Sequence, residues 1–229
     1  FVINGAKEDT RLKIDDNIML STDTKFENIV LNYDTCTNNV IFARGHKLEM
    51  GNNIRMKDRG CPSLVGGDIQ GDVCQSNIIV RSGLYKDIYG GGFFERSGVH
   101  GNITITISGG EVIGDIYAGS HDTGLISCGT TNINLEGGTV GGLVSGASKV
   151  LGLENSNHVN IQLLGTTLNR GEVYGGYALL SEDNDDTGIT TISIGQSYTL
   201  NKLVGFTKLD IKPQVELTVN EVLNHKGGI

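Results

Sequence analysis

The sequence is poor in proline, lacks tryptophan and has no long hydrophobic run. The lack of tryptophan weakens a carbohydrate-binding role without excluding it. There are 2 prolines among 229 residues while 38% of the residues are hydrophobic, which is not the composition of a disordered chain. No run of about 18 apolar residues occurs, so we expect no membrane span. The net charge of −8 disfavours nucleic-acid binding, because phosphates require a basic surface. No apolar pattern of helical period extends over three turns, so we expect almost no helix.

What the chain does contain is glycine, at 34 residues, and a repeated strand. Seven short aliphatic segments begin with Asn-Ile or, in the last case, Thr-Ile. Their isoleucines recur every 24 to 31 residues, at Ile29, Ile54, Ile78, Ile103, Ile133, Ile161 and Ile192. A period of this size with one strand per repeat indicates a solenoid. We expect the seven isoleucines to form a single inward-facing column.

A second column of aliphatic residues follows each isoleucine after ten to thirteen residues. Its members are Val40-Ile41, Leu64-Val65, Ile88-Tyr89, Ile116-Tyr117, Leu143-Val144, Val173-Tyr174 and Leu203-Val204. We expect the first residue of each pair to face the core and the second to be half covered. The segment 47–50 then predicts a third strand in the turn, ahead of the next Asn-Ile.

These columns predict an all-β fold, a right-handed parallel β-helix of about seven turns with three strands per turn. Residues 1–229 are expected to form one domain. Within it, 1–27 form an N-terminal cap or partial turn, 28–207 the repeat turns, and 208–229 the closing segment.

Some segments resemble those of a known group of folds. Residues 26–31, residues 40–48 and the Asp-Ile-Tyr-Gly-Gly-Gly corner at 87–92 carry the resemblance. They resemble pectate-lyase-like right-handed β-helices, especially the glycine-rich β-helical segments of secreted or surface proteins of Gram-positive bacteria. The resemblance implies an adhesive or display module, while polysaccharide-cleaving enzymes share the fold. A fold resemblance by itself does not choose between them.

The asparagines that precede the repeated isoleucines are expected to stack. A ladder of side-chain amides would satisfy polar groups at the corners of the solenoid, and we favour this structural role over a ligand role. The residues concerned are Asn28, Asn53, Asn77, Asn102, Asn132 and Asn160.

The later turns are longer than the earlier ones, and the additional residues fall on the third side, at 93–101, 120–130, 147–157 and 178–189. Repeat proteins carry function on such insertions. The candidate ligand-binding residues are Phe93, Phe94, Glu95, Arg96, His121 and Asp122, with Tyr89, Tyr117 and Tyr174 as an outward aromatic row; His100 and Glu154 lie in the same insertions. For the tyrosines, cross-strand packing under a covering loop is the favoured alternative.

A calcium site is a weaker expectation, and we expect no other cofactor. At the acidic run 182–186, Asp183, Asp185 and Thr187 ahead of Gly188 match the first half of a calcium loop, and the candidate ligands are Asp183, Asp185 and Asp186. The closing glutamate of such a loop is missing, because position 194 is Ile. A solvated acidic loop is the favoured interpretation.

The cysteines leave two accounts open. Cys36 and Cys61 each follow the isoleucine of their turn by seven residues, so stacking would bring them within disulfide range. The alternative is two free cysteines that fill a corner of the fold. Cys74 and Cys128 are expected to stay free.

No arrangement of catalytic residues stands out, so we lean towards a protein that is not an enzyme. We expect a binding or display module of a larger secreted or cell-surface bacterial protein, with a glycan or a host or cell-surface protein as partner. Neither a signal nor an anchor is recognised in the sequence. The alternatives are a polysaccharide lyase or glycoside hydrolase, and a structural stalk.

Overall fold

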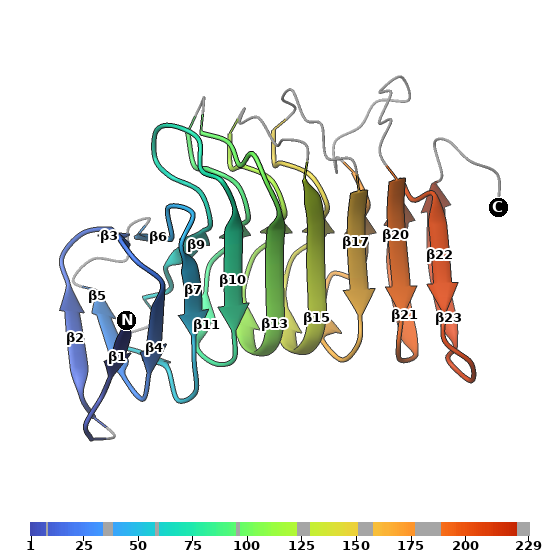
Figure 1. Ribbon diagram of the computed structural model, residues 1–229. Coiled ribbons are helices and arrows are strands. Elements are labelled where there is room, and N and C mark those ends of the chain that lie inside the picture. The colour runs from blue at the N-terminus through green and yellow to red at the C-terminus, as the bar shows by residue number, and fades with distance from the viewer. Residues whose placement is uncertain are drawn as a thin grey trace.

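The protein is a parallel β-solenoid, seen in a computed structural model that describes residues 1–7, 9–33, 39–57, 60–94, 97–122, 129–150, 158–176 and 189–223. About six turns run between β4 (Thr24–Glu27) and β20 (Ile189–Ile194). Figure 1 shows the strands side by side, from the N-terminus at one end to the red C-terminal strands at the other. The described residues contain no helix, and so none that could cross a membrane. The prediction of an all-β solenoid with three strands per turn is confirmed.

Three parallel sheets form the sides of the solenoid. The first sheet contains, in spatial order, β1 (Val2–Asn4), β4, β7 (Lys47–Met50), β10 (Ser76–Val80), β13 (Ile103–Val112), β15 (Thr130–Val140), β17 (His158–Leu163), β20 and β22 (Lys208–Ile211), with β11 (Leu84–Tyr85) and β18 (Thr167–Leu168) paired to the ends of β13 and β15. The second sheet contains β3 (Ile18–Met19), β6 (Val40–Phe42), β9 (Ser63–Val65), β12 (Ile88–Tyr89), β14 (Ile116–Tyr117), β16 (Val144–Ser145), β19 (Glu172–Tyr174), β21 (Tyr198–Val204) and β23 (Leu217–Leu223). The third sheet contains β2 (Arg11–Ile14), β5 (Val30–Tyr33) and β8 (Arg55–Met56).

All seven repeated isoleucines are buried, but the prediction that they form a single column is wrong. In the first sheet the inward column runs through Leu48, Ile78, Ile105, Ile133, Ile161 and Ile192. Ile103 lies two residues away from this column, opposite Ser76 and Thr131. In the fourth repeat, the isoleucine of the Asn-Ile pair therefore lies two residues before the position that Ile78, Ile133, Ile161 and Ile192 share.

The first two Asn-Ile pairs are at a corner, not in the first sheet. Asn28 and Asn53 have φ angles of 50° and 56°, a left-handed conformation that asparagine tolerates better than most residues. Ile29 and Ile54 come next and directly precede β5 and β8 of the third sheet. The segment Lys47–Met50, which we expected to be the third strand, is instead the first-sheet strand of its turn, because Leu48 pairs with Ile78.

The second column is confirmed in position with two one-residue corrections, but its outward residues, which were expected to be half covered, are buried. The inward residues are Ile41, Leu64, Ile88, Ile116, Val144, Val173 and Leu203, so Ile41 and Val144 replace the expected Val40 and Leu143. The two corrections follow from period-two alternation, since a shift of one residue exchanges the inward and outward sides. Tyr89 and Tyr117 are outward neighbours, and Ser145 separates them from Tyr174.

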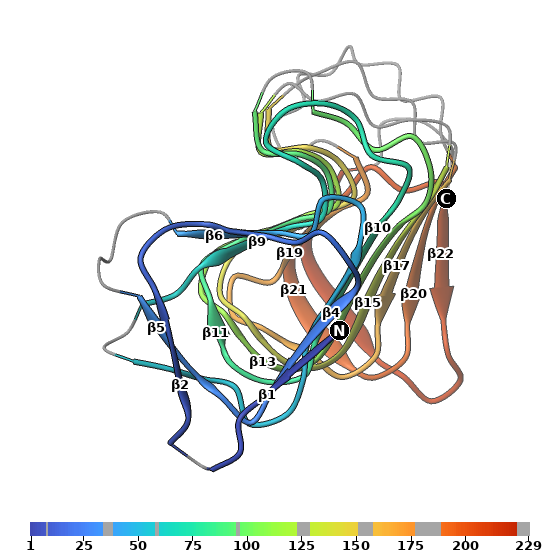
Figure 2. The ribbon, with the colours of Figure 1, turned by 60° about the vertical axis from the view of Figure 1, so that its left-hand side comes forward.

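The connections from the second sheet back to the first form a projecting lobe, which we call the arm. Its described residues are 66–75, 90–94, 97–102, 118–122 and 146–150. Figure 2 shows these teal, green and yellow connections rising together from the body and bending over the second sheet. Three buried serines link successive turns inside the arm: the Ser120 hydroxyl accepts a hydrogen bond from the Gly92 amide (3.1 Å) and donates to the Ser97 carbonyl (3.2 Å), and the Ser148 hydroxyl accepts from the Ser120 amide (2.8 Å).

Candidate functional site

A second hydrophobic cluster lies outside the solenoid, between the outer face of the second sheet and the arm. Its buried members are the outward residues of successive strands, and Ile69 and Phe93 of the arm pack against them. The members are Val40, Phe42, Val65, Tyr89, Tyr117, Leu143, Tyr174 and Val204. The tyrosine row is thus covered, with Tyr89 2%, Tyr117 5% and Tyr174 7% exposed. This burial favours the packing alternative for the three tyrosines.

The structure brings several of the predicted ligand-binding residues into one aromatic cluster. The rings of Tyr89 and Tyr117 are stacked, with centroids 5.7 Å apart and an interplanar angle of 4°. Phe93 meets Tyr89 edge to face at 6.1 Å, and Phe94 meets Phe93 at 5.1 Å. We call Phe42, Tyr89, Phe93, Phe94, Tyr117 and His121 the aromatic cluster.

His121 enters the cluster from the next turn of the arm. Its ring stacks on Phe93, with centroids 4.4 Å apart, and meets Tyr89 edge to face at 5.1 Å. Its buried Nδ1 atom has no hydrogen-bond partner. Burial, and then the positive charge of Lys149, lower the pKa of His121 below its usual value of 6.5. A neutral imidazole in this position acts mainly as a packing surface.

Phe94 is the most exposed member of the aromatic cluster, at 49%. Asp122 follows His121 and is half-buried. The remaining candidates divide between distant and undescribed positions. Tyr174 lies two turns from Tyr117. Glu95, Arg96, Glu154, Asp183, Asp185, Asp186, Cys36 and Cys128 are outside the described residues, so the calcium loop and the Cys36–Cys61 bridge stay predictions.

Carboxylates beside the tyrosines have structural partners. The Tyr117 hydroxyl donates to Asp115 at 3.1 Å and the Tyr174 hydroxyl donates to Glu172 at 3.0 Å. Burial and then the Glu172 carboxylate raise the pKa of Tyr174 to about 12. The Asp87 carboxylate accepts the Asp115 amide of the next turn at 2.9 Å. These acids therefore serve the backbone and the tyrosine hydroxyls between turns.

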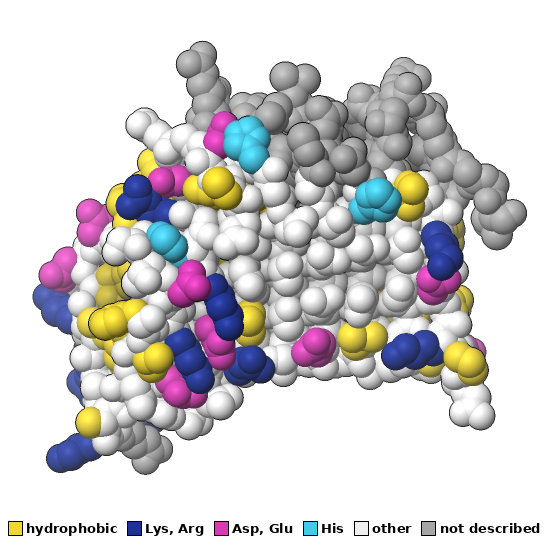
Figure 3. Space-filling model, in the orientation of Figure 1, with side chains coloured by type: hydrophobic (Ala, Val, Ile, Leu, Met, Phe, Trp, Pro, Cys, Tyr) yellow, Lys and Arg dark blue, Asp and Glu magenta, His cyan; other side chains and the backbone are white. Residues whose placement is uncertain are grey.

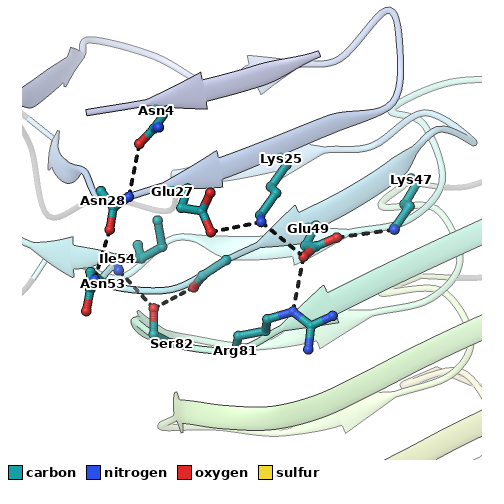
Figure 4. Close-up of polar contacts among 11 residues, drawn as sticks. Asn4, Lys25, Glu27, Asn28, Lys47, Glu49, Asn53, Ile54, Arg81 and Ser82 are labelled. Atoms are coloured by element: carbon teal, nitrogen blue, oxygen red, sulfur yellow. Dashed lines mark hydrogen bonds and ion pairs between the residues drawn. The ribbon is translucent and has the colours of Figure 1, made fainter. Parts of the chain in front are cut away.

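The asparagines form two short ladders instead of one long ladder. At the corner, Asn53 donates to Asn28 at 2.8 Å and Asn28 donates to Asn4 at 3.0 Å, as Figure 4 shows. In the first sheet, Asn160 donates to Asn132 at 3.0 Å. The expected continuous stack is wrong because Asn77 pairs with Thr104 and Asn102 precedes its strand, where its side chain accepts the Thr130 amide at 2.9 Å.

A group of charges surrounds Glu49 near the N-terminal end of the first sheet. Arg81 and Lys47 bind opposite oxygens of its carboxylate at 3.1 and 3.2 Å, and Lys25 lies 3.8 Å away while also binding Glu27 at 2.8 Å (Figure 4). Partial burial acts to raise the pKa of Glu49, but hydrogen bonds from Arg81 and Lys47 outweigh it and lower the pKa. Glu49 thus stays ionised and links β4 and β7 to Arg81, which directly follows β10.

Beyond this group, two outward rows of the first sheet carry no charge over five strands, although exposed Glu111, Glu136 and His158 lie on the same strands outside these rows. We call the two outward rows of β10, β13, β15, β17 and β20 the neutral face. Its residues are Asn77, Ile79, Thr104, Thr106, Asn132, Asn134, Asn160, Gln162, Thr191 and Ser193. Of these residues, Asn77, Asn132 and Asn160 were predicted from sequence, as members of a structural ladder. For the others, the polar residues at alternate positions of each strand were a usable signal.

The remaining described features do not form a further site. Among the described residues no three His, Cys, Asp or Glu side chains are grouped so that they could hold a metal ion. His100 is bound to Asp72 at 2.7 Å. A hollow of about 450 Å³ opens at the N-terminal end, where Ile14, Leu20 and Phe26 belong to the solenoid core, so it is an end of that core.

Comparisons with models of protein families, with curated proteins and with solved structures found no match to this chain.

Proposed function

We propose that this solenoid is a non-enzymatic binding and display module of a larger secreted or cell-surface bacterial protein, which attaches to a glycan or to a host or cell-surface protein. The observation that supports the proposal is the aromatic cluster. Residues from two turns of the arm and three strands of the second sheet meet there, and Phe94 is left 49% exposed at its edge.

The aromatic cluster is rigid and presents an apolar edge. Phe93 is held between Phe42, Tyr89 and His121, so the ring on which Phe94 rests is fixed before any ligand arrives. An immobilised aromatic edge loses little conformational entropy on binding. Aromatic side chains also dominate the energetics of protein interfaces and present a flat apolar surface to other rings.

The test is binding of the purified protein to an array of glycans and host surface proteins. Phe94→Ala should weaken the strongest interaction by about tenfold or more, in the range of a lost interface anchor. Ile113→Ala is the matched control, because Ile113 is 48% exposed on the body of the solenoid, and it should leave binding unchanged. Equal loss in both variants would contradict the assignment to the aromatic cluster. Release of unsaturated uronates from polygalacturonate would contradict a non-enzymatic role.

A further inference from the structure

We propose that the neutral face binds an uncharged linear polysaccharide whose chain lies along the solenoid axis. This surface is on the outside of the first sheet, whereas the aromatic cluster is on the outside of the second sheet. The proposal is therefore independent of the role of the aromatic cluster. Figure 3 shows the uncharged expanse, with most charged side chains towards its two ends and one acidic side chain at its lower edge.

The distribution of charge determines the class of ligand. At one end the two rows of the neutral face continue into Lys47 and Glu49, and at the other end into Lys208 and Asp210. Between these ends the two described rows contain no Lys, Arg or His to pair with a uronate, sulfate or phosphate. The net charge of −8 also repels polyanions. A neutral ligand meets no unfavourable charge on this surface.

The spacing of the neutral face favours a repeating, extended ligand. The strands stay in register across all five turns in these two rows. Equivalent side chains are therefore about 4.8 Å apart along the axis, and the rows are about 6.6 Å apart. The axial step is close to the length of one sugar residue in an extended chain, so successive residues would meet equivalent groups.

The polar groups are ordered by one another. The Asn160 side-chain amide donates to Asn132 at 3.0 Å, and the Asn134 side-chain amide donates to the Thr106 hydroxyl at 3.3 Å. All four side chains are half-buried between neighbours. Their fixed positions reduce the entropy lost when a ligand binds.

Amides and hydroxyls suit the hydroxyls of a sugar. An amide has two N–H donors and a carbonyl with two lone pairs, so an asparagine with one ladder bond retains capacity for a ligand. Each sugar hydroxyl can both donate and accept in turn. A protein partner would be expected to require apolar or aromatic anchors, and in these rows the one apolar side chain is Ile79.

The experiment is retention of the purified protein on insoluble cellulose, chitin, mannan and β-1,3-glucan, with polygalacturonate as the acidic comparison. The test variant is Asn132→Asp with Gln162→Glu, which keeps side-chain shape, keeps the acceptor for Asn160, and adds two charges to the neutral face. The control is Gln70→Glu with Asn169→Asp, which adds the same charges at exposed positions elsewhere. Melting temperatures establish that both variants are folded.

We expect at least one neutral polymer to retain the wild-type protein. The test variant should be retained about tenfold less or weaker still, because its added charges are left unpaired against an uncharged ligand. The control variant should be retained like the wild type. Phe94→Ala should also leave this retention unchanged, which separates the two surfaces. The proposal is wrong if no neutral polymer retains the protein, if polygalacturonate alone does, or if the test variant binds like the wild type. It is also wrong if sedimentation shows a wild-type dimer that the test variant converts to monomers, since the neutral face would then join two copies.

Discussion

The imidazole of His121 stacks on the ring of Phe93 at a centroid distance of 4.4 Å and an interplanar angle of 20°. The two residues are on successive turns of the arm, and the Gly92 carbonyl accepts the His121 amide at 2.9 Å, which holds the stack in place. A titratable ring is thereby part of the packing that supports Phe94, and the stability of the arm becomes linked to pH.

His121 should make the protein less stable in mild acid. Because its native pKa is below its usual value, the unfolded chain takes up a proton more readily than the native chain. The contribution is fully present above about pH 6.5 and is lost as the pH falls through the native pKa. In His121→Phe, whose ring preserves the stack, the fall in melting temperature between neutral and mildly acidic pH should be smaller. The control His158→Gln changes an exposed histidine and should keep the wild-type profile, whereas an unaltered profile in His121→Phe would contradict the prediction.

Replacement of Ile103 by Ala should destabilise the solenoid by about 2 to 5 kcal/mol, as expected for a large-to-small change in a packed core. Ile103 is 0% exposed and faces the interior. The outward neighbour Thr104 provides the control, and Thr104→Ala should cost less than about 1 kcal/mol. Denaturant unfolding of both variants measures the difference, and similar losses would show that the assigned inward and outward sides are wrong.

Ser82 connects two backbone groups at a corner of the solenoid, as Figure 4 shows. Its hydroxyl donates to the Gly51 carbonyl at 2.6 Å and accepts the Ile54 amide at 2.8 Å. Ser82→Ala removes both partners and should lower the free energy of unfolding by about 1 to 3 kcal/mol. The exposed Ser21 is the control, and Ser21→Ala should change stability by less than about 0.5 kcal/mol. If Ser82→Ala lowers the free energy of unfolding no more than Ser21→Ala does, the two hydrogen bonds of Ser82 do not stabilise the corner.

The acidic run 182–186 should give no stabilisation by calcium, because the closing glutamate of a calcium loop is missing. Melting curves with and without millimolar calcium should coincide. A ligand that binds only the native state raises the melting temperature. A calcium-dependent increase that disappears in Asp183→Ala with Asp185→Ala would therefore establish the metal site that we do not expect.

Repetition made the architecture predictable from sequence. An aliphatic strand that returns every 24 to 31 residues can bury its apolar side only by stacking on its neighbours, so the parallel solenoid follows from the pattern. The second column was predictable to within one residue for the same reason. The burial of all seven isoleucines also follows from their apolar side chains, whichever corner or strand they occupy.

The register of the first sheet could not be predicted, because the Asn-Ile dipeptide occurs in two backbone conformations. Asn28 and Asn53 occupy a left-handed corner, whereas Asn132 and Asn160 are extended strand residues, and side-chain amides form a ladder in either setting. The sequence by itself determined that the chain stacks into parallel turns, since that outcome depends on apolar periodicity. Only the tertiary structure decided which outward side chains are covered and which face water: the arm bends over the tyrosines of the second sheet and leaves the neutral face of the first sheet open.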